Sequence, residues 1–164
     1  MIPSDRKRKQ ARLIEPMQSG DTRALRAIAD LIRTCRNGQK GYCTAVDGVT
    51  DANIRDLFQG IAAQRGRFAA ELESLATPLR EKSSAEGAAP GWVPRSWIHI
   101  RSTLGTGNET ELLFECGRGE KEAVERYQEA LTTRLPAPIE ALVRRQYEEV
   151  KEAYETLRTL EKLN

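Results

Sequence analysis

The side chains best placed to do chemistry are polar residues that interrupt apolar stretches. Gln39 and Glu120 occupy matching places in two similar strings, TCRNGQKGY and ECGRGEKE. Arg65, Gln146 and Glu149 fall at about the same height when residues are counted back from the connecting turns. Because burying such groups without partners is expensive, we expect them to meet water, a ligand or one another. Their types allow an arginine–carboxylate network or a carboxylate site for metal ions.

The elements that must position this polar layer are predicted to be helices. Apolar residues recur at steps of three and four over four long stretches, which is the spacing of a helix that buries one face. Asp21 and Asp51 are expected to cap the first two helices, and Pro78 is expected to end the second. The predicted helices span residues 22–47, 51–77, 109–133 and 138–162.

The connections between these helices predict the topology. The first and third connections are short, so the helices on either side of each form an antiparallel hairpin. Residues 78–108 form a long crossover, in which we expect Ser96–Leu104 to be a short helix whose Trp97 packs on the bundle. The sequence therefore predicts an all-α fold, with residues 21–164 forming one four-helix bundle of two hairpins joined by a crossover.

The two hairpins also resemble each other in sequence. Residues 31–40 and 112–121 align at an offset of 81 and share two apolar positions, a cysteine, a glycine and a lysine. Glycine inside a helix costs about 1 kcal/mol relative to alanine, so its recurrence here indicates close packing, and the nearby cysteine fills the same layer. Buried free thiols are favoured over a disulfide between the two cysteines. The predicted packing residues are Cys35, Gly38, Cys116, Gly119 and Trp97.

Composition narrows the class of protein. A chain of 164 residues is long enough for one domain with a sizeable core. The net charge of +2 is uneven: residues 1–12 carry +4 and the remainder −2, so the body is not a basic surface for nucleic acid. Residues 1–20 form a basic arm that lacks the apolar segment of a signal peptide. We expect this short polar arm to be disordered; the alternative is an arm that binds phosphate or a membrane surface. No apolar run could span a membrane, and three cysteines without metal-binding spacing predict a reducing compartment, the cytoplasm.

Several strings together resemble a known family. They are ADLIRTCRNGQKGY, AAQRGRFAAEL, PRSWIHIRSTLGTG, LLFECGRGEKEA and RRQYEEVKEAYETLR, and the resemblance extends over about residues 24–160. The chain is similar to uncharacterised bacterial proteins classed as ferritin-like four-helix-bundle domains of unknown function. The resemblance implies the ferritin-like fold with its long crossover, and it brings no established activity.

The sequence departs from what a ferritin-like metal centre needs. Bundles that hold two metal ions use a Glu from each of two helices and a Glu-x-x-His motif from each of the others. This chain has no Glu-x-x-His, and its one histidine, His99, lies in the crossover. Arg65 would repel a metal, whereas its guanidinium can pair with Glu120 or Glu149. We therefore expect a polar layer with no cofactor; the alternative is a di-iron or manganese site built on Glu120 and Glu149.

Two classes of function follow from these alternatives. The first is a non-enzymatic bundle acting as an interaction, scaffold or stress-associated protein, because the buried layer is neutralised by its own charges. We expect this protein to form a homo-oligomer, a dimer, through an outer helix face or the Trp97 crossover, and an unidentified protein partner is compatible with the same surfaces. The second class is a degenerate ferritin-like metal-binding protein or oxidoreductase that uses Glu120 and Glu149.

Overall fold

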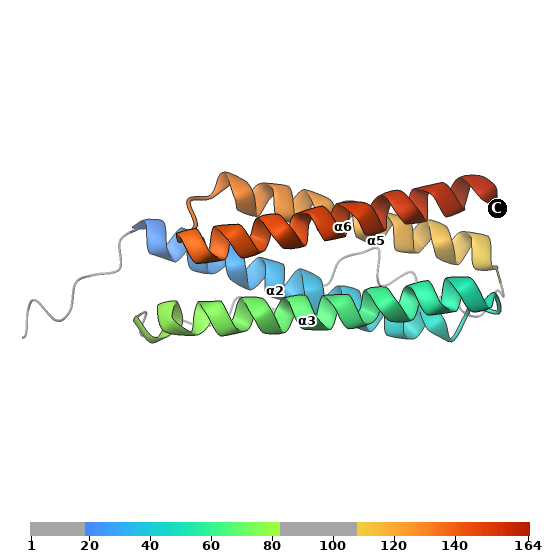
Figure 1. The fold of residues 1–164 in the computed structure, drawn as a ribbon, viewed down its shortest axis with the longest axis horizontal. Coiled ribbons are helices and arrows are strands. Elements are labelled where there is room, and N and C mark those ends of the chain that lie inside the picture. The colour runs from blue at the N-terminus through green and yellow to red at the C-terminus, as the bar shows by residue number, and fades with distance from the viewer. Residues whose placement is uncertain (1–18, 83–107) are drawn as a thin grey trace, which may run out of the picture.

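The structure, a computed structural model, describes residues 19–82 and 108–164, which are helical apart from short turns (Figure 1). These residues form four helices, the number that the apolar spacing predicts. The predicted helix Ser96–Leu104 with Trp97, the histidine His99 and most of the basic arm lie outside the described residues. The helices are α2 (Ser19–Val46), α3 (Ala52–Lys82), α5 (Glu109–Thr132) and α6 (Ala137–Leu163).

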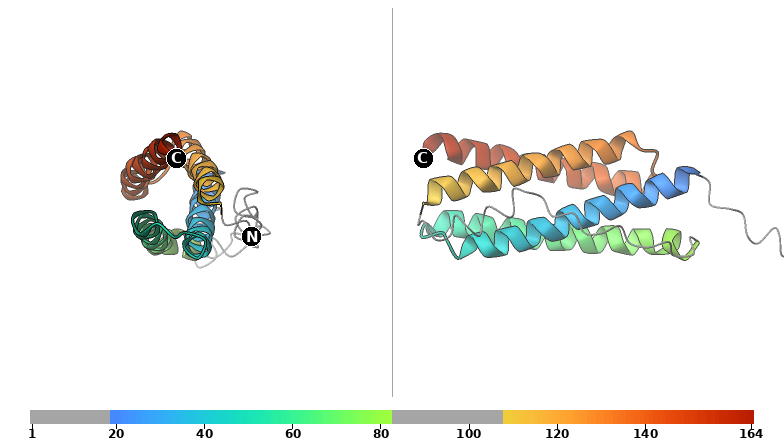
Figure 2. Two further views of the ribbon diagram at one scale, coloured as in Figure 1. Left: turned by 90° about the vertical axis from the view of Figure 1, so that its right-hand side faces the viewer. Right: turned by 180° about the vertical axis from the view of Figure 1, so that it is seen from behind.

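The helices pack as an elongated bundle of two antiparallel hairpins. α2 packs along α3, and α5 along α6; the hairpins meet where α2 contacts α5 and where α3 contacts α6 (Figures 1 and 2). α3 ends and α5 begins at opposite ends of the bundle, and the two run in the same direction. The predicted all-α four-helix bundle is confirmed. No helix within the described ranges combines the length and apolar character needed to cross a bilayer.

Local sequence explains where the helices begin. The Asp51 carboxylate accepts hydrogen bonds from the backbone N–H groups of Asn53 at 2.8 Å and Ile54 at 3.0 Å, which caps α3. The Asn108 side chain accepts from the N–H of Glu111 at 3.2 Å and caps α5 in the same way. At the start of α6, a proline occupies the first turn, where a missing N–H removes no helical bond.

The second helix is longer than predicted. Pro78 was expected to end it, yet α3 continues to Lys82 with Pro78 inside the helix. One reason is visible in the packing: Leu79, beyond the proline, is half-buried against the apolar core. This tertiary contact favours one more helical turn, and it outweighs the local preference of a residue before proline for an extended backbone.

Glu109 joins the start of α5 to the turn between α2 and α3. Its carboxylate accepts from the Thr50 hydroxyl at 2.6 Å, from the Thr50 backbone N–H and from the Asp51 N–H at 3.2 Å. The Thr50 side-chain hydrogen bond is the largest cause of the lowered pKa of Glu109, followed by the backbone bond from Thr50. One end of the bundle is therefore held by a carboxylate that links the two hairpins.

The apolar core consists of two clusters arranged along the bundle axis. The first cluster includes Ile28, Leu31, Cys35, Phe68, Leu72, Ala123, Tyr127, Val143 and Val150. The second includes Tyr42, Phe58, Ile61, Ala62, Leu112, Leu113, Cys116, Ala153 and Leu157. On each helix the boundary falls at the same height, between Cys35 and Tyr42, Ala62 and Phe68, Cys116 and Ala123, and Val150 and Ala153. Buried polar residues occupy this height.

Candidate functional site

A buried ion pair between Arg65 and Glu120 occupies the middle of the bundle. The two side chains are 2% and 0% exposed, and Arg65 Nη2 donates to Glu120 Oε2. Arg65 Nη1 donates to Gln64 Oε1 at 2.6 Å, and the guanidinium carbon lies 5.7 Å from the centre of the Phe68 ring. α3 and α5 lie diagonally across the bundle, so the pair joins one hairpin to the other through the core.

The stem of this arginine packs against α2 at Gly38. A Cβ on Gly38 would lie 3.4 Å from Arg65 Cγ and 3.6 Å from its Cδ, so the aliphatic stem of Arg65 rests against the α2 backbone. A reciprocal contact lies next to it, where a Cβ on Gly66 would approach Gln39 Nε2 at 2.6 Å. Gly66 therefore leaves the space that the Gln39 side chain occupies, whereas a Cβ at position 38 would make an ordinary contact with Arg65.

Tyr42 completes the surroundings of the Glu120 carboxylate. This α2 residue is fully buried, and its hydroxyl lies near the Glu120 carboxylate. Burial first, and the negative charge of Glu120 second, raise the pKa of Tyr42 well above its ordinary value. Burial disfavours the charge of Arg65, but the charge of Glu120 and its other neighbours outweigh burial and raise its pKa. The arginine is therefore charged and the tyrosine neutral.

A second buried chain of hydrogen bonds crosses all four helices next to this pair. The Tyr127 hydroxyl donates to Gln146 Oε1 at 2.8 Å. Because its hydrogen is used there, the Tyr127 oxygen accepts from the Cys35 thiol, which lies 3.2 Å away. Gln146 Nε2 in turn donates to the Phe68 carbonyl at 3.3 Å and to Glu71 Oε2 at 2.9 Å. Every polar atom of the buried Gln146 amide is thus satisfied.

Not every predicted member of the polar layer faces the centre. Glu149 has a side chain that is 35% exposed, and it contacts Arg67 at 3.6 Å and Gln64 at 3.2 Å in place of Arg65. Gln39 was expected to face the centre, but it is half-buried between α2 and α3, where its Oε1 accepts from Arg36 at 3.4 Å. The structure brings Arg65 and Glu120 into contact, places Gln146 in the adjacent chain, and leaves Gln39 and Glu149 at the periphery.

The predicted packing residues within the described ranges are all buried. Cys35 and Cys116 are free thiols in the two separate core clusters, whereas Cys43 is exposed. Burial raises the pKa of Cys35, and it raises the pKa of Cys116 well above its ordinary value, so both thiols stay protonated. Gly38 and Gly119 are buried as well. Trp97 lies outside the described residues.

Several residues have a polar role that was not predicted from the sequence. Tyr42 and Tyr127 lie on the buried apolar faces of α2 and α5. A tyrosine on such a face has a hydroxyl that needs a hydrogen-bond partner, and this could have indicated their polar role. Gln64 and Glu71 carried no signal, because their role depends on how α3 is turned toward α6. Glu115 is 8% exposed, and its Oε2 has no hydrogen-bond partner among the described residues. Its other oxygen lies 3.5 Å from Arg118.

The residues at the centre do not fit a two-metal site. Glu120 is fully buried at this level, and one of its two oxygens accepts from the Arg65 guanidinium, whose positive charge would repel a metal ion. Glu149 is engaged by Arg67 and Gln64. No group of three or more His, Cys, Asp or Glu side chains in the described ranges is arranged to hold a metal ion. The donors present suit hydrogen bonding to arginine better than coordination of a divalent cation.

The fold and the site define a class, the all-α four-helix bundles, here with an ion pair at the centre that links the two hairpins. Within that class, the chain belongs to the family described as Domain of unknown function (DUF2383), which matches residues 23–133. The match contains Arg65, Glu120 and Tyr42, and it ends before α6 with Gln146 and Glu149. A comparison with curated protein sequences found no significant match.

Proposed function

We propose that this protein is a non-enzymatic, ferritin-like helical bundle that acts through protein interactions, as a scaffold or stress-associated protein. The observation that supports this proposal is the state of the central layer. Arg65 donates to Glu120 and Gln64, and the Tyr42 hydroxyl lies near Glu120. The guanidinium thereby balances the charge of the Glu120 carboxylate, which disfavours a role for it as a base or metal ligand.

The thiols favour a cytoplasmic setting for this role. Cys35 and Cys116 are buried and unpaired, and Cys43 is exposed as a free thiol on the surface of α2. Free thiols of this kind persist in reducing compartments. The same exposed cysteine gives a convenient handle for attaching a label without disturbing the core.

Metal content and iron oxidation test the non-enzymatic role. The protein should be purified without chelator and its bound metals measured by plasma mass spectrometry, with Fe(II) oxidation followed for the wild type and for Glu120→Gln. We expect trace metal and no difference in oxidation rate between the two proteins. About two equivalents of iron or manganese, as two-metal bundles hold, together with oxidation lost in Glu120→Gln, would establish the metal-binding alternative instead.

Self-association is the second part of the proposal. Phe114 is 52% exposed on α5, within a helix and away from any chain end, and is therefore a candidate contact for a second copy. Light scattering coupled to gel filtration should show a dimer for the wild type and a monomer for Phe114→Ser. Leu163→Ser is the matched control: Leu163 is 76% exposed but lies at the last residue of α6. A wild-type monomer, or a dimer that survives Phe114→Ser, would contradict this placement.

A further inference from the structure

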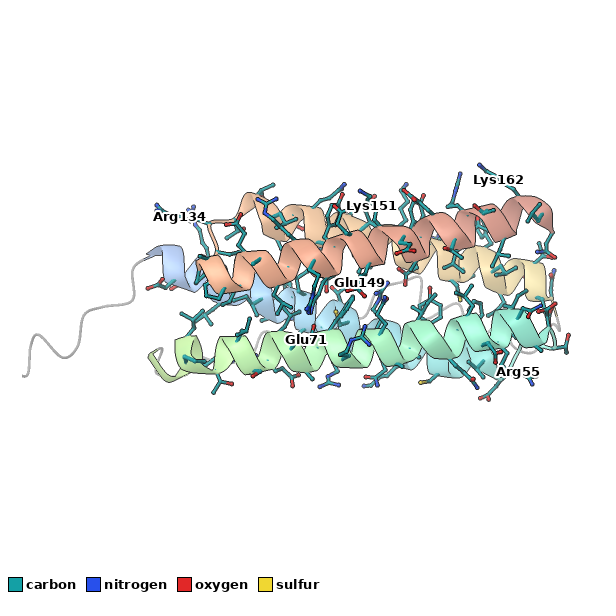
Figure 3. The ribbon with its side chains drawn as sticks, viewed as in Figure 1. Arg55, Glu71, Arg134, Glu149, Lys151 and Lys162 are labelled. Atoms are coloured by element: carbon teal, nitrogen blue, oxygen red, sulfur yellow. The ribbon has the colours of Figure 1, made fainter. Side chains whose placement is uncertain are left out.

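The contact between α3 and α6 is built on two carboxylates held in a reciprocal way. Glu71 of α3 accepts from Arg145 at 2.8 Å and from Gln146 at 2.9 Å, both on α6. Glu149 of α6 accepts from Gln64 at 3.2 Å and lies 3.6 Å from Arg67, both on α3. Figure 3 shows Glu71 and Glu149 between the two helices. We call this set the α3–α6 seam; it comprises Gln64, Arg67, Glu71, Arg145, Gln146 and Glu149.

Dissolved ions can reach the charges of this seam. The side chains of Glu71 and Glu149 are 31% and 35% exposed, and those of Arg145 and Arg67 are 57% and 58% exposed. Ion pairs of this exposure are weakened by salt, because the Debye length falls from about 10 Å at 0.1 M to about 3 Å at 1 M. The Arg65–Glu120 pair beneath the seam is closed to water and is screened much less.

The opposite contact between the hairpins is more extensive, since α2 and α5 pack against each other more closely than α3 and α6 do. All four helices contribute buried apolar residues to the two core clusters. Separating α2 from α5 would therefore expose more apolar surface than separating α3 from α6. Local opening takes place where few apolar contacts are lost, which is at the seam.

We propose that the two hairpins part locally along the α3–α6 seam, with the α2–α5 contact acting as the hinge, and that ionic strength sets how often they part. Opening draws α6 away from α3 and breaks the Gln146 contacts with Glu71 and the Phe68 carbonyl. Gln146 is also the acceptor for Tyr127, which bonds to Cys35. The seam therefore controls the access of solvent to the Cys35 thiol.

The three cysteines of the chain supply the test. Cys43 is exposed and serves as the internal reference for reagent activity, Cys35 is linked to the seam through Tyr127 and Gln146, and Cys116 is buried in the other core cluster. The rate at which each thiol reacts with a maleimide is measured by peptide mass spectrometry at low and high sodium chloride. We expect the Cys35 rate in the wild type to rise roughly two- to thirtyfold with salt, the range that two partly exposed ion pairs supply, while the Cys116 rate stays slow.

Charge-neutral variants separate the seam from general effects of salt. In Glu71→Gln/Glu149→Gln, Cys35 should react fast at low salt, and added salt should change its rate little. Glu73→Gln is the matched control, because Glu73 pairs with Arg36 at 3.2 Å within the first hairpin and does not cross the seam. This control should retain the salt response of the wild type.

Hydrogen exchange of the unmodified protein gives an independent reading. Salt should speed exchange in α3 and α6 more than in α2 and α5. A Cys35 rate that does not respond to salt in the wild type would overturn the proposal. So would equal acceleration of Cys35 and Cys116, or equal acceleration of exchange in all four helices, because both describe global opening.

Discussion

Removing one member of the central ion pair should be strongly destabilising. In Glu120→Ala, Arg65 keeps its bond to Gln64 but loses its counter-charge, and its 2% exposed side chain has no access to water. Breaking a buried ion pair lowers the free energy of unfolding by about 3–5 kcal/mol. Because Arg65 keeps its bond to Gln64, we expect a loss at the lower end of this range, about 3 kcal/mol. For a domain of this size, a loss of about 3 kcal/mol lowers the melting temperature by roughly 6–12 °C.

Urea denaturation followed by far-ultraviolet circular dichroism measures this loss. A surface pair gives the matched control: Glu125 is 61% exposed and lies 4.0 Å from Lys121, so Glu125→Ala should change stability by less than about 0.5 kcal/mol. Equal slopes of the transition in all proteins would show that the comparison concerns stability and not a change in the unfolded state.

A double substitution distinguishes the pair from simple loss of packing. Arg65→Met/Glu120→Leu removes both charges and retains most of the side-chain volume, and such replacements are often neutral or stabilising by about 1–4 kcal/mol relative to the ion pair. We expect the double variant to be far more stable than the sum of the Arg65→Met and Glu120→Leu losses predicts. Additive losses, or an unchanged urea midpoint in Glu120→Ala, would refute the reasoning.

Three further predictions concern Gly38, Glu109 and the cysteines. Gly38→Ala places a Cβ at an ordinary contact distance of 3.4 Å from Arg65 Cγ, so the melting temperature of this variant should stay the same or rise. Gly38→Leu should displace the Arg65 side chain and lower the melting temperature. The pKa of Glu109 is lowered in the folded protein, so the ionised carboxylate stabilises the fold above the ordinary pKa of 4.5, and this stabilisation is lost as pH falls through the folded pKa. The melting temperature of the wild type should therefore exceed that of Glu109→Gln at neutral pH, and the two should converge in acid. A difference in melting temperature that does not change with pH would contradict this. A thiol dye should rapidly label Cys43 alone in the native protein and all three cysteines after unfolding; fast native labelling of Cys35 or Cys116 would contradict their burial.

The sequence was sufficient for the architecture because apolar spacing reports directly on burial. Residues at steps of three and four identified each helix, and connection lengths identified the hairpins. Pro78 shows where this reasoning fails: local preference argued for an end, and the packing of Leu79 against the core decided otherwise. Helix ends depend on such tertiary contacts, and spacing within one helix does not contain them.

The site could be predicted in part. Arg65 and Glu120 each stand among apolar residues on the buried face of a helix, so their proximity could be expected from height alone. Glu149 has the right height but the wrong direction, since it precedes the buried Val150 and successive residues differ by about 100° around a helix. Gln39 likewise points toward α3, where Gly66 leaves space that no pattern within α2 could reveal.

The central claim is that an ion pair, and not a metal centre, occupies the middle of the bundle. The most direct test is the thermal unfolding of chelator-treated protein with and without excess Mn²⁺ or anaerobic Fe²⁺, for the wild type and for Glu120→Gln. A ligand at a hundred times its Kd would stabilise the native state by about 2.7 kcal/mol. We predict no metal-dependent rise in melting temperature for either protein. A rise in the wild type that Glu120→Gln abolishes would contradict the claim.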